Sequence, residues 1–260
     1  HPQQAMAAID VLRVSGWRAR REFSEAWLIY EHATELQDGE GHPLDLHWRV
    51  MWEGRRAVSD DEFWEGAQIL KIGKTETRAL NPTDQLLHVC VHGANWDVIP
   101  PVRWVADAMT VMSRSTIDWP RLIEQAKKRE LSLVMSKTLG YLKRLLDAPV
   151  PDDVLETLNS MRPSSREKLF FQTRTSSQTA IRRLPVLWRW MEGFCATRGV
   201  ASQGRVVNLV RYFQSLWRLD HLWQVPLHVI YKAARGSVGI PYWYLRNRLL
   251  RRSLNIPPVR

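Results

Sequence analysis

The spacing of apolar residues changes near residue 81, and this change limits the folds that the chain can adopt. Before residue 81 the pattern is mostly short and alternating, as in strands, whereas beyond it apolar residues recur at helical spacing. Residues 2–15 are an exception, because Ala5, Ile9 and Leu12 form a helical stripe that ends at Gly16. The order predicts an α+β protein, in which a small sheet with helices precedes a helical bundle.

A β-hairpin is the clearest prediction in the first part of the chain. Its arms are residues 33–37 and 43–51, joined by a turn that is rich in glycine and acidic residues. In the second arm apolar and polar residues alternate, which places Asp45, His47 and Arg49 on one face of a strand.

Other segments before residue 81 are less strongly patterned. Residues 22–31 suit either a short helix or a strand, residues 60–68 suit a short helix, and residues 69–80 suit a small hairpin around Gly73.

Beyond residue 81 the chain predicts a series of helices with short connections. Asn81-Pro82-Thr83-Asp84 is a typical helix start, with a cap residue, a first-turn proline and an acidic residue. The expected helices are 82–95, one that begins at Pro100-Pro101, 117–129, 131–146 and one that begins at Pro151. Residues 164–179 are polar and indicate a linker, and the helices expected after it, rich in tryptophan and arginine, are 184–194, 206–222 and 226–235. The changes of pattern near residues 81 and 164 predict domains at 1–80, 81–163 and 164–260.

The chain is basic, with 37 lysines and arginines against 27 acidic residues and a formal net charge of +10. Such a charge attracts phosphates on nucleotides, nucleic acid or anionic lipid. An arginine-rich surface without a specific partner accounts for it equally well. The two distant cysteines, Cys90 and Cys195, fit neither a zinc site nor a disulfide framework and favour a reducing, cytoplasmic setting.

Several short motifs follow one another in a recognisable order. They are Leu44-Asp45-Leu46-His47-Trp48-Arg49-Val50, then residues 80–88 followed by His92, then Arg103-Trp104-Val105-Ala106-Asp107, then Ile117-Asp118-Trp119. In this order they resemble the uncharacterised nucleotidyltransferase family of the polymerase-β-like superfamily, over roughly residues 1–160.

The resemblance implies a fold, a reaction and a cofactor. The fold would be a small mixed sheet with flanking helices, followed by a helical domain and here by basic, aromatic C-terminal helices. The reaction would be metal-dependent transfer of a nucleotidyl group from a nucleoside triphosphate to an acceptor hydroxyl, with Mg²⁺ as the cofactor. Asp45 would be the third carboxylate of the catalytic metal site.

The family's other two carboxylates come from an acid-x-acid pair that precedes the strand of Asp45. Between His1 and Asp45 no strand that follows a glycine-containing turn carries such a pair. The expectation is therefore that the natural protein extends upstream of His1 and that this chain is impaired in catalysis.

The remaining candidate residues are basic or lie on helices. His47 and Arg49 are expected to contact phosphate, although a strand face whose charges are simply solvated is the alternative. His88 and His92 lie four residues apart on one helical face. Zinc would need a third ligand there, so packing between helix and sheet is the main expectation and nucleotide contact a secondary one.

Two aspartates are the last of the candidate residues. Asp107, on an apolar helix, is a weaker nucleotide-site candidate that would otherwise be a buried partner of Arg103 or a histidine. Asp118 suits a helix cap.

A rival function is a non-catalytic binding module. Residues 236–260 combine aromatic and basic side chains, which suits docking to a partner protein or to an anionic membrane surface at the inner membrane face. Nucleic acid is the least favoured partner, because only charge supports it and no RNA-binding motif is present.

Overall fold

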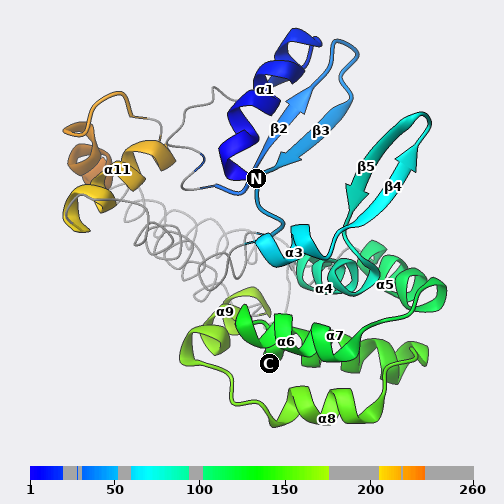
Figure 1. The fold of residues 1–260 in the computed structure, drawn as a ribbon. Helices are drawn as coiled ribbons and strands as arrows, with labels where there is room; N and C mark the ends of the chain where they lie inside the picture. Colours follow the sequence, from blue (N-terminus) through cyan, green and yellow to red (C-terminus); the bar gives the residue numbers. More distant parts are fainter. Residues whose placement is uncertain are drawn as a thin grey trace, which may run out of the picture. The chain divides into compact units, whose positions relative to one another are not determined.

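The computed structural model describes residues 1–19, 28, 31–51, 60–93, 102–175, 205–217 and 219–231. The chain divides into two compact units, residues 1–200 and residues 201–260. In the first unit small sheets precede a series of helices (Figure 1), which confirms the predicted α+β class. The predicted domain boundaries after residues 80 and 163 remain predictions.

The first sheet has three antiparallel strands in the order β1-β2-β3 among the described residues. Helix α1 contacts β1, and Ile9 of the helix and Leu36 of the sheet are both fully buried. Because buried and less buried residues alternate along β2, one face of this strand packs against a small core. The bounds are Pro2–Gln4 for the 3₁₀ turn η1, Ala5–Val14 for α1, Arg18–Ala19 for β1, Ala33–Gln37 for β2 and Pro43–His47 for β3.

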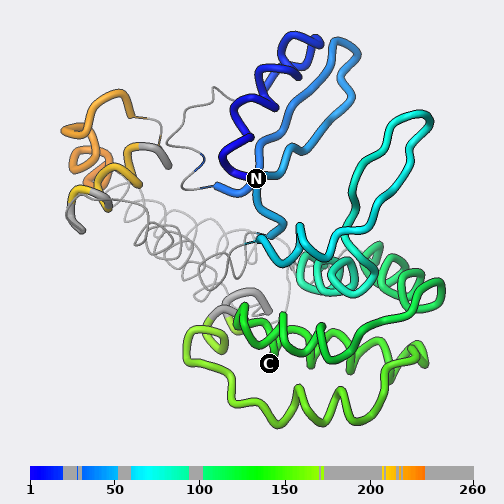
Figure 2. Tube along the Cα trace, viewed as in Figure 1, coloured from blue at the N-terminus to red at the C-terminus, as the bar shows by residue number. Residues whose placement is uncertain are grey.

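A second, separate sheet is the hairpin of β4 (Gln68–Ile72) and β5 (Thr75–Ala79), which follows the short helix α3 (Asp61–Glu65). It confirms the hairpin that was predicted around Gly73. Almost every residue of both strands is exposed. The β2–β3 and β4–β5 hairpins can both be followed in Figure 2.

The helices that follow enclose the main hydrophobic core. Helix α4 contacts α5, α6 and α7, and α7 contacts α8 and α9. Fully buried members of the core include Leu86, Leu87, Cys90, Ala108, Leu122, Ala126, Met135, Leu139 and Leu142. The helices are α4 (Pro82–Gly93), α5 (Arg103–Arg114), α6 (Trp119–Lys128), α7 (Ser132–Leu146), α8 (Asp152–Ser160) and α9 (Ser165–Thr175).

Residues 164–179 were predicted to be a linker. This prediction is wrong over residues 165–175, which form helix α9. The Ser164 side chain accepts the backbone N–H of Glu167 at 3.1 Å, which is a helix-starting contact. The buried Glu167 carboxylate in turn accepts the backbone N–H of Leu133 at 2.6 Å, at the start of α7. Burial raises the pKa of Glu167. The polar residues that suggested a linker are thus a cap and a contact between helices.

The second unit contains α11 (Arg205–Trp217) and a helical segment at 224–231. Aromatic rings pack within it: Phe213 stacks on Trp217 at 4.7 Å between ring centroids, and Trp217 lies 4.8 Å from His228. Four predictions fall on residues that the structure does not describe: the helix at 184–194, the segment 236–260, the helix start at Pro100-Pro101 and the segment 22–31. In the last of these only Leu28 and Glu31 are described. Where the structure describes helices, none has both the length and the apolar character needed to cross a bilayer.

Candidate functional site

Strand β3 presents Asp45 and His47 on its exposed face. Both are exposed, whereas Leu44 and Leu46, which alternate with them along the strand, are half-buried. The register of the hairpin places Glu35 of β2 directly opposite Asp45. Residues opposite one another in an antiparallel pair share a face, with Cβ atoms about 4.5–5.5 Å apart. The face of the sheet therefore carries two neighbouring carboxyl groups beside an imidazole.

The strand ends at His47, so Arg49 does not extend this face as the longer predicted arm required. The backbone N–H groups of Trp48 and Arg49 both donate to the carbonyl oxygen of His32, at 3.0 and 3.2 Å. The Trp48 side chain is buried, and its indole N–H donates to the carbonyl oxygen of Glu31 at 2.9 Å. These bonds bend the chain directly after His47, and Arg49 lies half-buried on that bend.

His47 lies within electrostatic range of His92 on α4. Partial burial lowers the pKa of His47, and the positive charge of a protonated His92 lowers it further. The Asp45 carboxylate and a hydrogen bond with the backbone of Arg49 oppose this shift but do not cancel it. His47 is consequently more often neutral at pH 7 than an unperturbed histidine.

Two further histidines adjoin this pair. The ring of His32 meets the ring of His47 edge-on at 5.1 Å between centroids. The rings of His88 and His92 stack at 5.5 Å on successive turns of α4. The structure thus brings together the strand and the helix that carry Asp45, His47, His88 and His92, which the sequence had indicated separately.

Asp107 has a different setting. It lies on the exposed side of α5, where its carboxylate is 3.8 Å from the Arg103 guanidinium. The predicted pairing with Arg103 is present, but the expected burial is wrong, because more than half of the Asp107 side chain is exposed. This contact is an ordinary surface ion pair between residues four apart on a helix.

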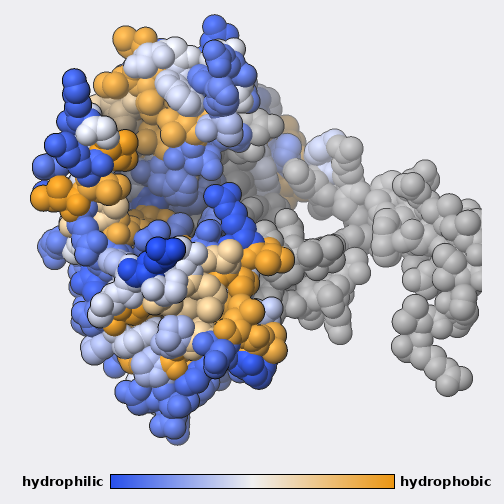
Figure 3. All heavy atoms as spheres, turned by 90° about the vertical axis from the view of Figure 1, so that its right-hand side faces the viewer, coloured by the Kyte–Doolittle hydropathy of each residue, from blue (hydrophilic) through white to orange (hydrophobic). Residues whose placement is uncertain are grey.

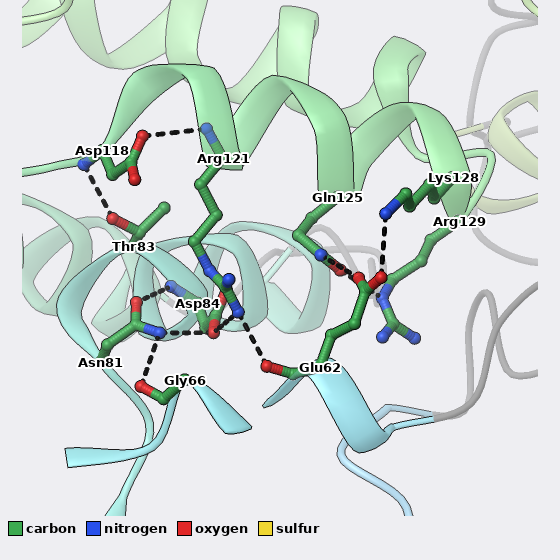
Figure 4. Close-up of polar contacts among 10 residues, drawn as sticks. All are labelled: Glu62, Gly66, Asn81, Thr83, Asp84, Asp118, Arg121, Gln125, Lys128 and Arg129. Atoms are coloured by element: carbon green, nitrogen blue, oxygen red, sulfur yellow. Dashed lines mark hydrogen bonds and ion pairs between the residues drawn. The ribbon is translucent and has the colours of Figure 1, made fainter. Parts of the chain in front are cut away.

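A buried polar network, which no motif in the sequence indicates, fixes α3, α4 and α6 to one another (Figure 4). At its centre the Asp84 side chain, with no exposed surface, accepts two N–H groups from Arg121, at 3.0 and 2.8 Å. Asn81 also donates to Asp84, at 2.6 Å, and to the carbonyl oxygen of Gly66. Arg121 reaches the carbonyl oxygen of Glu62 as well, so one guanidinium joins all three helices.

The start of α6 is part of the same network. The Asp118 side chain accepts the backbone N–H of Arg121 at 3.0 Å, which confirms the predicted cap. The backbone N–H of Asp118 donates to the Thr83 hydroxyl at 2.8 Å. The helix start at 81–84 is thus also a tertiary contact, a second role that its sequence alone does not reveal.

The other half of the network connects α6 to the segment that leaves β3. The buried Arg129 lies over the ring of Phe63, with 4.0 Å between its guanidinium carbon and the ring centroid, and pairs with Asp60 at 3.3 Å. Asp60 also accepts the backbone N–H of Val50 at 2.9 Å. Glu62 adds bonds from Gln125 and Lys128. The end of β3, just beyond His47, is therefore held by the helices.

The described residues were compared with the needs of a metal ion. Within them, no three histidine, cysteine, aspartate or glutamate side chains are grouped so as to hold a metal ion. Asp45 with Glu35 opposite it supplies carboxylate oxygens, which are the donors that Mg²⁺ prefers. Mg²⁺ commonly uses only one or two carboxylates and takes its remaining ligands from substrate phosphates and water. The pair suits that mode of binding and not a cage made by the protein alone.

Comparison with known proteins bears on this region. No curated protein and no solved structure matches the chain. The model of a family described as uncharacterised nucleotidyltransferase matches residues 1–147, a range that runs from the first helix to the end of α7 and includes Asp45, His47, His88 and His92. Because the match covers more than half of the 260 residues, the chain belongs to the uncharacterised nucleotidyltransferase family.

Proposed function

We propose that the chain takes part in transfer of a nucleotidyl group from a nucleoside triphosphate to a hydroxyl of a small-molecule acceptor. The observation that carries the proposal is the exposed face of β3 within the family-matched region. There Asp45 lies opposite Glu35, beside an imidazole that is within electrostatic range of His92. Carboxylates next to histidines on an open face suit a phosphate-bearing ligand that arrives with a divalent cation.

Charge explains why the cation is part of the proposal. Two carboxylates repel a triphosphate, so this face binds a nucleotide only if a cation lies between them. Asp45 and Glu35 would hold Mg²⁺ together with the phosphates and water. When bound, the ion neutralises phosphate charge and makes the α-phosphorus more susceptible to attack.

The histidines have separate roles in this proposal. His92, when protonated, attracts the phosphate oxygens. His47, whose pKa is lowered, accepts the proton of the acceptor hydroxyl as its oxygen bonds to the α-phosphorus. The bond between that phosphorus and the bridging oxygen breaks, and pyrophosphate leaves. A cytoplasmic setting, where nucleoside triphosphates are available, is part of the same proposal.

The test compares two exposed aspartates of the matched region. Titration calorimetry with each of the four nucleoside triphosphates and MgCl₂ is expected to detect binding that chelation with EDTA abolishes. Asp45→Asn is expected to weaken that binding by at least roughly 10–100-fold, the scale of losses seen when the surroundings of a metal site are changed. Asp107→Asn, an exposed aspartate on α5, is the matched control and should leave it unchanged.

Two results would contradict the proposal. One is the absence of binding by every triphosphate in the presence of Mg²⁺, and the other is equal binding by the Asp45→Asn and wild-type chains. If magnesium-dependent binding is found, release of pyrophosphate, measured across a panel of hydroxyl-bearing metabolites, would identify the acceptor class.

A further inference from the structure

The β4–β5 hairpin has two strands and two unpaired edges among the described residues. Its side chains are exposed on both faces, and Ile69, Leu70 and Ile72 have 70%, 46% and 64% of their surface exposed. Apolar side chains are visible at the surface on this side of the molecule (Figure 3). An isolated two-stranded hairpin is marginally stable in water, and a free edge is a template for a further strand.

The turn determines which backbone groups of β5 face its free edge. The two-residue loop begins at Gly73, whose φ of 60° suits a hairpin turn. Ile72 and Thr75, which flank the loop, exchange the turn's hydrogen bond, and bonded and non-bonded pairs then alternate along the strands. Thr75 and Thr77 therefore bond to β4, while Glu76 and Arg78 direct their N–H and C=O groups to the free edge.

This pattern permits few registers for an antiparallel pairing of β5 with another β5. In any such pair Glu76 and Arg78 must occupy hydrogen-bonded positions. The register centred on Thr77 places Glu76 of each copy opposite Arg78 of the other and sets the two Thr77 side chains side by side. Registers centred on Glu76 or on Arg78 place like charges opposite each other, which is destabilising.

We propose that β5 is a self-complementary edge through which two copies of this chain form a four-stranded sheet, in the register centred on Thr77. The pairing forms main-chain hydrogen bonds at Glu76 and Arg78, two opposite-charge pairs and one Thr–Thr pair. With Lys71 opposite Glu76 in the hairpin itself, one face carries a row of alternating charges across the junction.

The other edge of the hairpin lacks this complementarity. The equivalent pairing of β4 is centred on Leu70 and sets Lys71 against Ile69, without opposite charges. A contact of one short strand per chain is small beside the roughly 800 Å² per partner of a stable interface, so the dimer dissociates on dilution.

Charge reversal tests the register with the full chain. Sedimentation velocity over a concentration series is expected to show a monomer–dimer equilibrium for the wild-type chain. Glu76→Arg and Arg78→Glu should each weaken self-association by at least roughly tenfold, because each sets like charges opposite one another. An equimolar mixture of the two variants restores both opposite-charge pairs and should regain the wild-type dimer. A wild-type chain that stays monomeric, or a mixture that stays dissociated, overturns the proposal.

A disulfide test does not depend on charge. The register places the two Thr77 residues in a non-hydrogen-bonded pair with Cα atoms about 4.5 Å apart, within the range that a disulfide spans. In a Cys195→Ser background, Thr77→Cys should form a covalent dimer on mild oxidation. Leu70→Cys, opposite Thr77 in the same hairpin, is the matched control, because three strand spacings of about 4.8 Å separate it from its mate. Equal cross-linking of the two variants would overturn the proposal.

Discussion

Asp45 of β3 and Asp84 of α4 both belong to the family-matched part of the chain, but their surroundings differ in almost every respect. Asp45 is exposed and has another carboxylate, Glu35, opposite it. The Asp84 side chain has no exposed surface and accepts three N–H groups from Arg121 and Asn81. A buried carboxylate depends on its partners, because losing one leaves an uncompensated buried charge, whereas a carboxylate on an open face beside a like charge contributes little to stability. The difference separates structural residues from residues available for a ligand.

The largest effect on stability is expected from Arg121→Gln. This change removes the charge that compensates the buried Asp84 carboxylate, and breaking such a pair typically costs about 3–5 kcal/mol. Urea unfolding should show that loss, whereas Arg103→Gln, which breaks the exposed pair with Asp107, should cost only about 0–1 kcal/mol. Similar costs for the two variants would contradict the structural role of the network.

The next largest loss of stability is expected from a substitution at Gly93, which ends α4 directly after His92. A Cβ atom at Gly93 would lie 2.2 Å from the Trp104 side chain of α5. Gly93→Ala therefore overpacks this contact and should lower the free energy of unfolding by about 1–3 kcal/mol. Gly140→Ala is the control, because nothing lies within 4 Å of the added atom in α7, and it should stabilise the chain by about 0.5–1 kcal/mol. Thermal unfolding of both variants distinguishes the two outcomes.

Asp45→Asn is expected to have little effect on stability, in contrast to the changes at Arg121 and Gly93. Removing one of two facing carboxylates relieves repulsion, so the free energy of unfolding should rise slightly or stay within about 0.5 kcal/mol of the wild type. The same variant should lose nucleotide binding. A variant that unfolds in milder denaturant would show that Asp45 has a structural role and would weaken its assignment to the site.

Local signals in the sequence were sufficient for most of the elements. Turn residues and alternation predicted both hairpins, and the cap sequences at 81–84 and Asp118 predicted the starts of α4 and α6. Those features depend on residues within one turn of each other. The bond from Arg121 to Asp84 joins residues 37 apart, and no local pattern distinguishes that arginine from one on a solvated face.

The candidate site was predictable in part. The alternation of β3 placed Asp45 and His47 on one face, and the family resemblance gave Asp45 its expected role. The bend that removes Arg49 from that face depends on the carbonyl oxygen of His32, a contact that the sequence does not encode locally. The proximity of His47 to His92 is likewise a tertiary result, set by how the helices hold the end of β3.

The smallest expected effect is the pH dependence that His47 contributes. Its pKa is lowered in the folded chain, so below the ordinary histidine pKa of about 6.5 the unfolded chain binds more protons there. Stability therefore falls as the pH is lowered through that value towards the depressed pKa, and His47→Gln should flatten this part of the profile. An NMR titration measures the cause directly. Because the charge of His92 contributes to the shift, His92→Gln should raise the pKa of His47, whereas an unchanged value would show that the β3 face and α4 are not electrostatically coupled.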